Sequence, residues 1–355
     1  MAVGDSSTSF EAAAAGSPQA VAQFEDERTS LLHKIQNWLH QTPSAVPMIV
    51  LLLSVAIFGL AAGNFFRTGT LSLILQQIAV VGILGCAQSI VVLTAGIDLS
   101  VGAMAVFTSV IMGTLTFRWG IPTPISILVG LAAGTAMGAA NGFLVARMKL
   151  PPFIVTLGTW QIILAANYLY SANETIRSQD IAANAPLLQL WGWTFKIGVT
   201  TISLGVVLLV IMVLIMAYVL KHTAWGRHVY AIGDDAEAAK LSGVEVKRTL
   251  IQVYALAGFF CAIAGWVMIG RFGSVSPSAS TGVLGNIQSI TAVVIGGISL
   301  FGGRGSILGM FFGALIVGVF ELGLRMLGTD PQWTYLLIGA LIIGAVAIDQ
   351  WIRKA

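Results

Sequence analysis

Charged side chains are scarce in this sequence. Only 18 Lys and Arg and 15 Asp and Glu occur in 355 residues. That is 9% of the chain, whereas a soluble domain carries about 25%. So few charges cannot cover the surface of a water-soluble fold of this size. Soluble enzymes, nucleic-acid-binding proteins and disordered scaffolds are therefore disfavoured, and the outer face of the chain is expected to meet a lipid bilayer.

Cysteines and nucleotide-binding loops are also lacking. The two cysteines, Cys86 and Cys261, both lie in apolar stretches, so the sequence indicates no disulfide framework. No Gly-x-x-x-x-Gly-Lys-Ser/Thr loop occurs anywhere in the chain, and without this phosphate-binding loop no ATP site is expected. The sequence indicates no metal or cofactor site, and no enzymatic activity.

The N-terminal segment is unlike the rest of the chain. Residues 1–28 are rich in Ala and Ser and lack the basic and apolar regions of a signal peptide. We expect a cytoplasmic tail over residues 1–46, with a short amphipathic helix at about residues 30–41, where Leu31, Ile35 and Trp38 recur at helical spacing. This helix would lie either on the inner membrane surface or on the protein's own cytoplasmic face.

Ten apolar windows follow, long enough to cross a hydrocarbon core of about 30 Å. Because lipid offers the backbone no hydrogen-bond partners, they predict an all-α polytopic membrane protein with a transmembrane domain over residues 47–352. Of the 18 Lys and Arg residues, 12 fall on the side of the N-terminus, which favours both termini in the cytoplasm. The windows are 48–65, 71–95, 101–117, 124–146, 152–171, 198–220, 250–270, 283–302, 307–328 and 333–350.

Glycine recurs every fourth residue in two windows. Small residues at this spacing let two helix backbones approach closely, so both ladders predict helix–helix contacts. The ladders also suggest an internal repeat, but at another offset than the echo of Gln88-Ser89-Ile90 by Gln288-Ser289-Ile290. A repeat therefore stays an open alternative. The ladders are Gly130, Gly134, Gly138 and Gly142, and Gly305, Gly309 and Gly313.

The longest inner loop, residues 221–249, has the signals of one short helix from Asp235 to Ser242. Asp234 or Asp235 can cap its start, Lys240 falls in its last turn, and Gly243 suits the position after its end. A helix of two turns is marginal in water by itself. It is therefore expected to lie on its own membrane domain or on another protein.

Four motifs resemble those of a known family. Residues 233–244, GDDAEAAKLSGV, resemble the Glu-Ala-Ala coupling loop of ABC-importer permeases. Residues 96–102, GIDLSVG, 151–158, PPFIVTLG, and 296–305, GGISLFGGRG, resemble the signatures of the ribose-type sugar branch, and most of all its fructose-type members. The motifs run in the family's order over roughly residues 48–352. The loop lacks the longer Glu-Ala-Ala consensus of the maltose-type permeases.

The resemblance implies a subunit of an ATP-driven monosaccharide importer in a bacterial inner membrane, working by alternating access. Fructose is favoured, with ribose and mannose open. The implied partners are a cytoplasmic ATPase, a second permease copy in a homodimer and a periplasmic sugar-binding protein, and no nucleic acid. The residues expected to couple the chain to the ATPase are Arg227, Asp234, Asp235, Glu237, Ala238, Ala239, Lys240 and Gly243.

Polar and aromatic side chains within the windows are candidates for the sugar path, because an uncharged sugar needs hydrogen-bond partners and aromatic surface. Several share a helix face through spacings of seven or eleven residues. The alternative for each is an interhelical hydrogen bond. The candidates are Gln77, Gln88, Trp160, Gln161, Asn167, Tyr168, Asn286, Gln288 and Ser289.

Asp98 lies between two windows, flanked by Gly96 and Ser100. A carboxylate at membrane depth needs a partner or a water-filled cavity, whereas at the inner interface it would be solvated or cap the next helix. We favour a structural or gating role for these three residues. Glu321 and Arg325, four residues apart, are predicted to form a structural pair.

An ion-coupled secondary sugar transporter is the rival hypothesis. Such a protein would need a buried ionisable group or broken helices that hold an ion. Asp98, Glu321 and Asp349 come nearest to this requirement, and all three lie at window ends. The longest outer loop, 172–197, contains Trp191 and Trp193, which indicate either an interfacial anchor or, by the resemblance, a docking site for the binding protein.

Overall fold

Apolar helices make up most of the computed structural model, which describes residues 45–353. Six of them are long and apolar enough to cross a membrane, and α3, α5, α13 and α15 supply shorter apolar stretches. Together these helices match the ten predicted windows and confirm an all-α polytopic membrane protein. They are α3 (Ala45–Ala61), α4 (Thr68–Leu93), α5 (Val101–Phe117), α6 (Thr123–Ala146), α7 (Pro152–Ser171), α9 (Leu204–His222), α12 (Val246–Phe272), α13 (Ala279–Ile295), α14 (Ile307–Met326) and α15 (Pro331–Arg353). The predicted helix at 30–41 lies outside the described residues.

Two of the predicted boundaries were wrong. The window 198–220 begins as a helix only at Leu204, because β1 (Thr194–Ile197) and β2 (Thr200–Ser203) form an antiparallel hairpin before it. The window 283–302 ends as a helix at Ile295. Gly297 and Gly302 then take φ angles of 76° and 82°, which a helix does not use and glycine adopts freely. Hydropathy reports that a segment is apolar and does not show where it leaves the helix.

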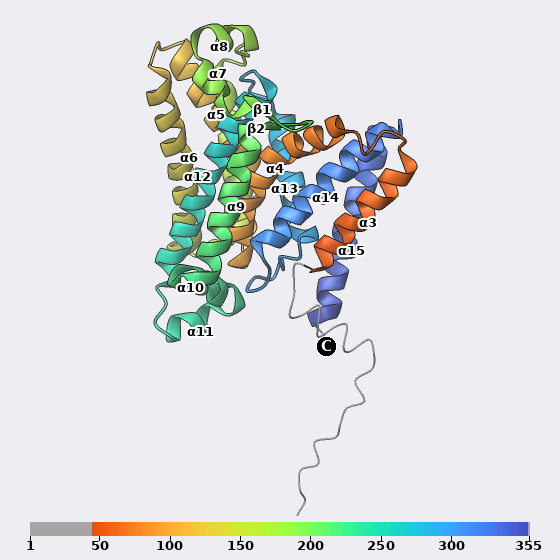
Figure 1. The fold of residues 1–355 in the computed structure, drawn as a ribbon. Helices are drawn as coiled ribbons and strands as arrows, with labels where there is room; N and C mark the ends of the chain where they lie inside the picture. The colour runs from red at the N-terminus through yellow and green to blue at the C-terminus, as the bar shows by residue number, and fades with distance from the viewer. Residues whose placement is uncertain (1–44, 354–355) are drawn as a thin grey trace, which may run out of the picture. The chain divides into compact units, whose positions relative to one another are not determined.

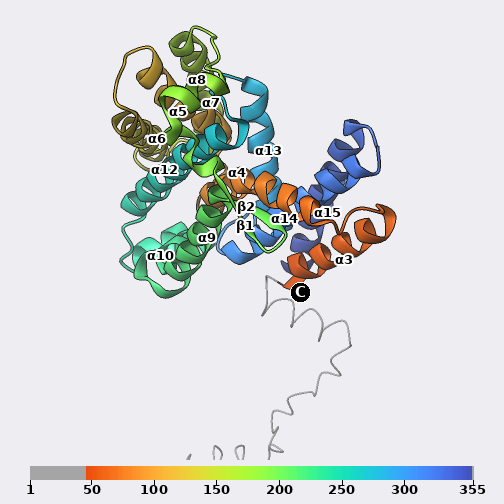
Figure 2. The ribbon, with the colours of Figure 1, turned by 45° about the horizontal axis from the view of Figure 1, so that its top comes forward.

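Helix α4 lies at the centre of the described domain, with α3, α14 and α15 on one side and α5, α6, α7 and α12 on the other (Figures 1 and 2). Every residue of α4 from Ile78 to Leu93 is buried. The outer helices instead expose large apolar side chains such as Leu60, Ile162 and Leu169. A surface of this kind fits lipid, which is as apolar as leucine.

The two ends of the helix bundle differ. At one end, called here the coupling end, lie α10 (Ala224–Asp234) and α11 (Ala236–Leu241). At the opposite end, called here the loop end, lie α8 (Ser178–Asn184), the 3₁₀ helix η1 (Pro186–Gly192) and the β1–β2 hairpin (Figure 1). The outer loop therefore has regular structure that its composition did not predict.

Both glycine ladders form close helix contacts, as predicted. A methyl group added at Gly138 would lie 2.1 Å from the carbonyl oxygen of Tyr254 in α12. One added at Gly313 would lie 2.0 Å from the carbonyl oxygen of Ala292 in α13. Such distances exclude any side chain, so the ladders bring α6 against α12 and α14 against α13.

Two turns at the coupling end share one geometry. Residues 94–100 join α4 to α5, and residues 296–306 join α13 to α14. Ala95 and Gly297 both have positive φ, at 59° and 76°, directly after their helices end. They lie 297 − 95 = 202 residues apart, close to the 200-residue offset of Gln88 and Gln288. The two turns therefore recur at nearly the offset of the two Gln-Ser-Ile motifs. This favours the repeat that those motifs indicate over the one that the glycine ladders suggest.

Candidate functional site

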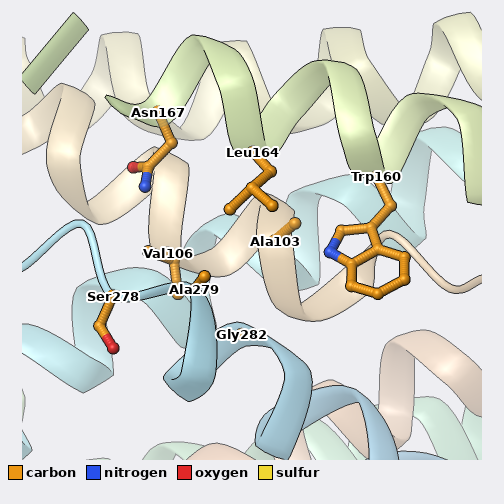
Figure 3. Close-up of a pocket in the computed structure, with 8 residues that line it drawn as sticks. All are labelled: Ala103, Val106, Trp160, Leu164, Asn167, Ser278, Ala279 and Gly282. Carbon is orange, nitrogen blue, oxygen red and sulfur yellow. The ribbon is translucent and has the colours of Figure 1, made fainter. Parts of the chain in front are cut away.

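A hollow lies between α5, α7 and the start of α13 (Figure 3). In this conformation it encloses about 10 Å³, room for a group of about the size of a water molecule. The lining combines an indole ring and two polar side chains with small and aliphatic residues, which is the mixture expected of a site for a small polar ligand. The lining residues are Ala103, Val106, Trp160, Leu164, Asn167, Ser278, Ala279 and Gly282.

Asn167 gives this hollow its free hydrogen-bonding group. Its side-chain amide donates to the carbonyl oxygen of Pro277 at 3.1 Å, and the residue is only 2% exposed. The amide oxygen has no partner in the described structure. A buried acceptor without a donor is costly, and a ligand hydroxyl could satisfy it. The structure thus brings two predicted path residues, Trp160 and Asn167, into one site.

The other predicted stripe on α7 faces outward. Gln161 is exposed, and Tyr168 is 37% exposed. Gln77 on α4 is half-buried, whereas Gln88, three turns along the same helix, is fully buried and both polar atoms of its amide lack a partner. These four residues do not join the hollow, because they are absent from its lining.

Asn286 of α13 binds the protein's own backbone. Its amide nitrogen donates to the carbonyl oxygen of Leu99, and its oxygen accepts from the Gly102 amide at 3.4 Å. Ser289 likewise donates back to the carbonyl oxygen of Asn286 at 2.8 Å. Irregular backbone at membrane depth must be satisfied by protein groups. The contacts of Asn286 therefore support the interhelical alternative, whereas the bond of Ser289 lies within α13.

A charged cluster near the loop end ties four helices together. The predicted pair of Glu321 and Arg325 on α14 is confirmed, with 3.5 Å between Arg325 Nη2 and Glu321 Oε1. Gln288 of α13 donates to the other oxygen of Glu321 at 2.9 Å. Arg271 of α12, within electrostatic reach of Glu321, donates to the carbonyl oxygen of Gln77 in α4 at 3.0 Å. Nothing in the local sequence around Arg271 indicates this contact.

Asp98 is fully buried in the 94–100 turn, so the alternative of a solvated carboxylate was wrong. One of its oxygens, Oδ1, accepts from the backbone amide of Ser100 at 2.7 Å and from the Ser100 hydroxyl at 2.6 Å. Thr156 of α7 donates to the carbonyl oxygen of Ile97 at 3.1 Å. Side chains thus replace water around this turn, and Asp98 holds the residue that precedes α5.

The helix predicted in the inner loop is present as α11. Asp235 caps it, since its Oδ1 accepts from the backbone amides of Glu237 at 2.9 Å and Ala238 at 3.0 Å. Sequence reasoning missed the preceding α10, for which Thr223 is the cap: its hydroxyl accepts from the Gly226 amide at 3.1 Å. A threonine before an amphipathic stretch was the available signal.

Gly233, near the end of α10, packs closely between the end of α4 and the turn of residues 296–306. A methyl group added at Gly233 would lie 1.8 Å from the carbonyl oxygen of Leu93 and 2.5 Å from the amide nitrogen of Gly303. Tyr230 of α10 donates its hydroxyl to the carbonyl oxygen of Gly305 at 2.9 Å. Burial raises the pKa of Tyr230, so this hydroxyl stays protonated. The inner loop is therefore hydrogen-bonded to the 296–306 turn and packed against the end of α4.

The predicted coupling residues differ in their exposure to solvent. Ala239 is 4% exposed and packs inward, so it cannot itself contact a partner. Leu241, which the prediction omitted, is 89% exposed and is the apolar group that the helix presents outward. The coupling residues that remain exposed are Arg227, Asp234, Asp235, Glu237, Ala238, Lys240 and Gly243.

Within residues 45–353, no group of three or more His, Cys, Asp or Glu side chains is placed to hold a metal ion. The chemistry that the described site offers is hydrogen bonding and aromatic contact at the hollow, and mechanical contact at the coupling end.

Known proteins match almost the whole chain. A family model described as branched-chain amino acid transport system / permease component matches residues 70–346. The fructose import permease protein FrcC of Rhizobium meliloti is 64% identical over 349 residues, which cover 98% of this chain and 96% of that protein.

More distant relatives are also import permeases. The ribose import permease protein RbsC of Escherichia coli strain K12 is 34% identical over 88% of this chain and 94% of its own length. The galactose/methyl galactoside import permease protein MglC of Haemophilus influenzae is 33% identical over 84% and 92%. No solved structure matches the chain. This chain is therefore a multi-pass membrane protein that belongs to the family of import permeases, as the relatives named above do.

Proposed function

We propose that this chain is the membrane-spanning permease subunit of an ATP-driven monosaccharide importer in a bacterial inner membrane, and that fructose is its substrate. Identity of 64% over nearly the full length of a fructose import permease supports this sugar over ribose or galactose, whose permeases share about half as many residues. The partners are a cytoplasmic ATPase, a periplasmic sugar-binding protein and a second copy of this chain.

The observation that supports the proposal most directly is the close packing of Gly233 between Leu93 and Gly303. Backbone meets backbone there, with no flexible side chain to absorb a displacement. A push on α11 must therefore move the end of α4 and the α13–α14 turn together. This arrangement suits a subunit that receives force from an ATPase, and the chain itself has no nucleotide-binding loop.

The sugar passes the hollow between α5, α7 and α13. Trp160 offers an aromatic face, and the unpartnered oxygen of Asn167 accepts from a sugar hydroxyl. Ala103 and Val106 of the hollow lie on α5, the helix that begins directly after the 94–100 turn. Movement of that turn would therefore change the hollow, which links ATPase closure to release of the sugar.

The first experiment measures uptake of labelled fructose and ribose into proteoliposomes, with and without ATPase, binding protein and lumenal ATP. We expect uptake only when all three are present, with fructose preferred. Leu241→Asp should reduce this uptake at least tenfold and leave the thermal midpoint unchanged, because the side chain is exposed. Leu241→Met, which keeps an apolar group, is the matched control. Uptake by this chain alone, driven by a proton or sodium gradient, would instead establish an ion-coupled transporter.

The path is tested by the sugar concentration at half-maximal uptake. Trp160→Ala and Asn167→Ala should each raise it several-fold, because they remove the aromatic face and the free acceptor. Gln161→Ala, next to Trp160 but exposed outside the hollow, should not. Equal values for all three variants would contradict the assignment of the hollow.

A further inference from the structure

A chain of hydrogen bonds joins three buried side chains beneath the start of α5. Asn141 of α6 donates its amide to the Ser100 hydroxyl at 3.0 Å, and this hydroxyl donates to Asp98 Oδ1 at 2.6 Å. Asp98 and Ser100 are 0% exposed and Asn141 is 1% exposed. This cluster is therefore closed to bulk water, and its polar atoms must satisfy one another.

Three polar atoms of this region have no partner in the described structure: Asp98 Oδ2, Asn141 Oδ1 and Tyr254 Oη. The glycine contacts pack α6, α12 and the 94–100 turn together. A methyl group at Gly142, beside Asn141, would lie 2.9 Å from Tyr254 Cβ, and one at Gly96 would lie 2.8 Å from Tyr254 Oη. The Tyr254 hydroxyl thus lies against the same turn that carries Asp98.

Within residues 45–353, the Asp98 carboxyl group has no cationic ion-pair partner. The titratable groups that act on it electrostatically, Tyr254 and Cys261, are both acids on α12. The contacts of its turn with α7 and α13 come from neutral Thr156 and Asn286.

An ionised carboxylate in these surroundings would be a buried charge without a partner, which proteins avoid by neutralising the group. The second oxygen of Asp98, Oδ2, accepts no hydrogen bond in the described structure, so no donor there would offset its charge. A proton on Oδ2 removes that charge. The close approach of Gly96 to Tyr254 leaves little room for a metal ion in that place.

We propose that Asp98 is a buried proton-binding site and that it is a neutral carboxylic acid in this conformation, in which the 94–100 turn is packed against α6 and α12. Protonation takes one proton from water when the turn is buried and returns it when the turn is exposed. Asp98 is a positioning residue, because it touches neither the hollow nor the coupling surface. Its turn lies between the two, ending at Leu93 on one side and at α5 on the other.

The direct test is infrared spectroscopy of the full-length protein in lipid at about pH 5, where a free Asp side chain is ionised. The wild type should show a carboxylic-acid C=O band that Asp98→Asn lacks, since ionised carboxylates do not absorb there. The same difference spectrum without that band overturns the proposal. This measurement needs no transport partner, so its failure is distinguishable from failure of the proposed sugar import.

Stability against pH gives a second measurement. A free Asp side chain ionises at about pH 3.9, so above this pH unfolding releases the bound proton. The folded wild type should then lose stability as pH rises, with its unfolding constant growing up to about tenfold per pH unit until the buried group itself ionises. Asp98→Asn, which stays neutral, should lack this part of the slope. A slope equal to that of the wild type would contradict the proposal.

Two further measurements distinguish the proposed proton site from a metal-ion site and from a carboxylate with a merely structural role. If sodium or potassium raises the thermal midpoint of the wild type but not of Asp98→Asn, the site holds a metal ion and the proposal fails. With a proton at the site, Asp98→Asn should keep most of the ATP-driven uptake, whereas Asp98→Ala should lose it. Loss of uptake in Asp98→Asn with its fold intact would show that the charge is needed.

Discussion

The backbone amide of Gly303 donates to the carbonyl oxygen of Leu93 at 3.0 Å. These residues are 210 positions apart, and their bond joins the end of α4 to the turn between α13 and α14. Gly233 of α10 packs against both of its atoms. One junction at the coupling end therefore contains backbone from three distant parts of the chain, and it is the sharpest place to test coupling.

Gly233→Ala should break this junction. The added methyl would lie 1.8 Å from Leu93 O and 2.5 Å from Gly303 N, and neither backbone atom can move aside alone. Overpacking of this kind costs about 1–3 kcal/mol, so we expect a lower thermal midpoint and a fall of at least tenfold in ATP-driven uptake. Gly69→Ala, whose methyl would meet nothing within 4 Å, is the control. Normal uptake by Gly233→Ala would show that the junction does not carry the coupling.

Gly138→Ala should separate α6 from α12. Its methyl would lie 2.1 Å from the Tyr254 carbonyl oxygen, which belongs to a rigid helix backbone. We expect a loss of about 1–3 kcal/mol, seen as a thermal midpoint several degrees lower in detergent. Gly158→Ala in α7, whose methyl would meet nothing within 4 Å, is the control. Equal midpoints for the two variants would argue against backbone contact as the reason for the ladder.

Asn286→Ala should destabilise the start of α5. It leaves the carbonyl oxygen of Leu99 and the amide of Gly102 without their side-chain partner in a buried place. Leaving a buried group unsatisfied costs about 1–3 kcal/mol, so the thermal midpoint should fall. Asn184→Ala, which removes an exposed side-chain amide, should leave the midpoint unchanged. An unaltered midpoint with weaker sugar uptake would restore Asn286 to the path.

Asp235→Ala should loosen α11. Both cap bonds, to Glu237 N and Ala238 N, are lost, and removal of such a cap costs about 1 kcal/mol. In a helix of six residues we expect faster hydrogen exchange at these amides and weaker stimulation of the ATPase. Asp235→Asn keeps an acceptor and should restore most of both. Asp234→Ala is the control, because the Asp234 carboxylate bonds to neither amide. If the two amides exchanged as fast in Asp234→Ala as in Asp235→Ala, the capping role of Asp235 would be contradicted.

Several features of the fold followed from local sequence. The apolar windows located the membrane helices because lipid forces long apolar segments to satisfy their own backbone. The cap at Asp235 and the glycine after Lys240 located α11, since capping depends on neighbouring residues alone. The glycine ladders predicted close packing, because absence of a side chain is visible in the sequence itself.

The local sequence could not predict which group each of these side chains contacts in the folded protein. The sequence predicted Asn286 and Ser289 as path residues because a polar side chain looks the same whether it binds a sugar or a distant carbonyl. Ala239 was predicted at the ATPase surface, although it packs inward while Leu241 points out. Arg271 joined a four-helix cluster through Gln77, which lies 194 residues away.

The sequence by itself determined that this chain is a helical membrane protein, because composition, span length and capping are properties of short segments. Only the tertiary structure decided which polar groups are free to meet a ligand. That freedom depends on the donors and acceptors that folding brings beside each group, as at Asn167, which keeps an unpartnered oxygen at the hollow, and at Asp98, which is sealed among α6 and α12.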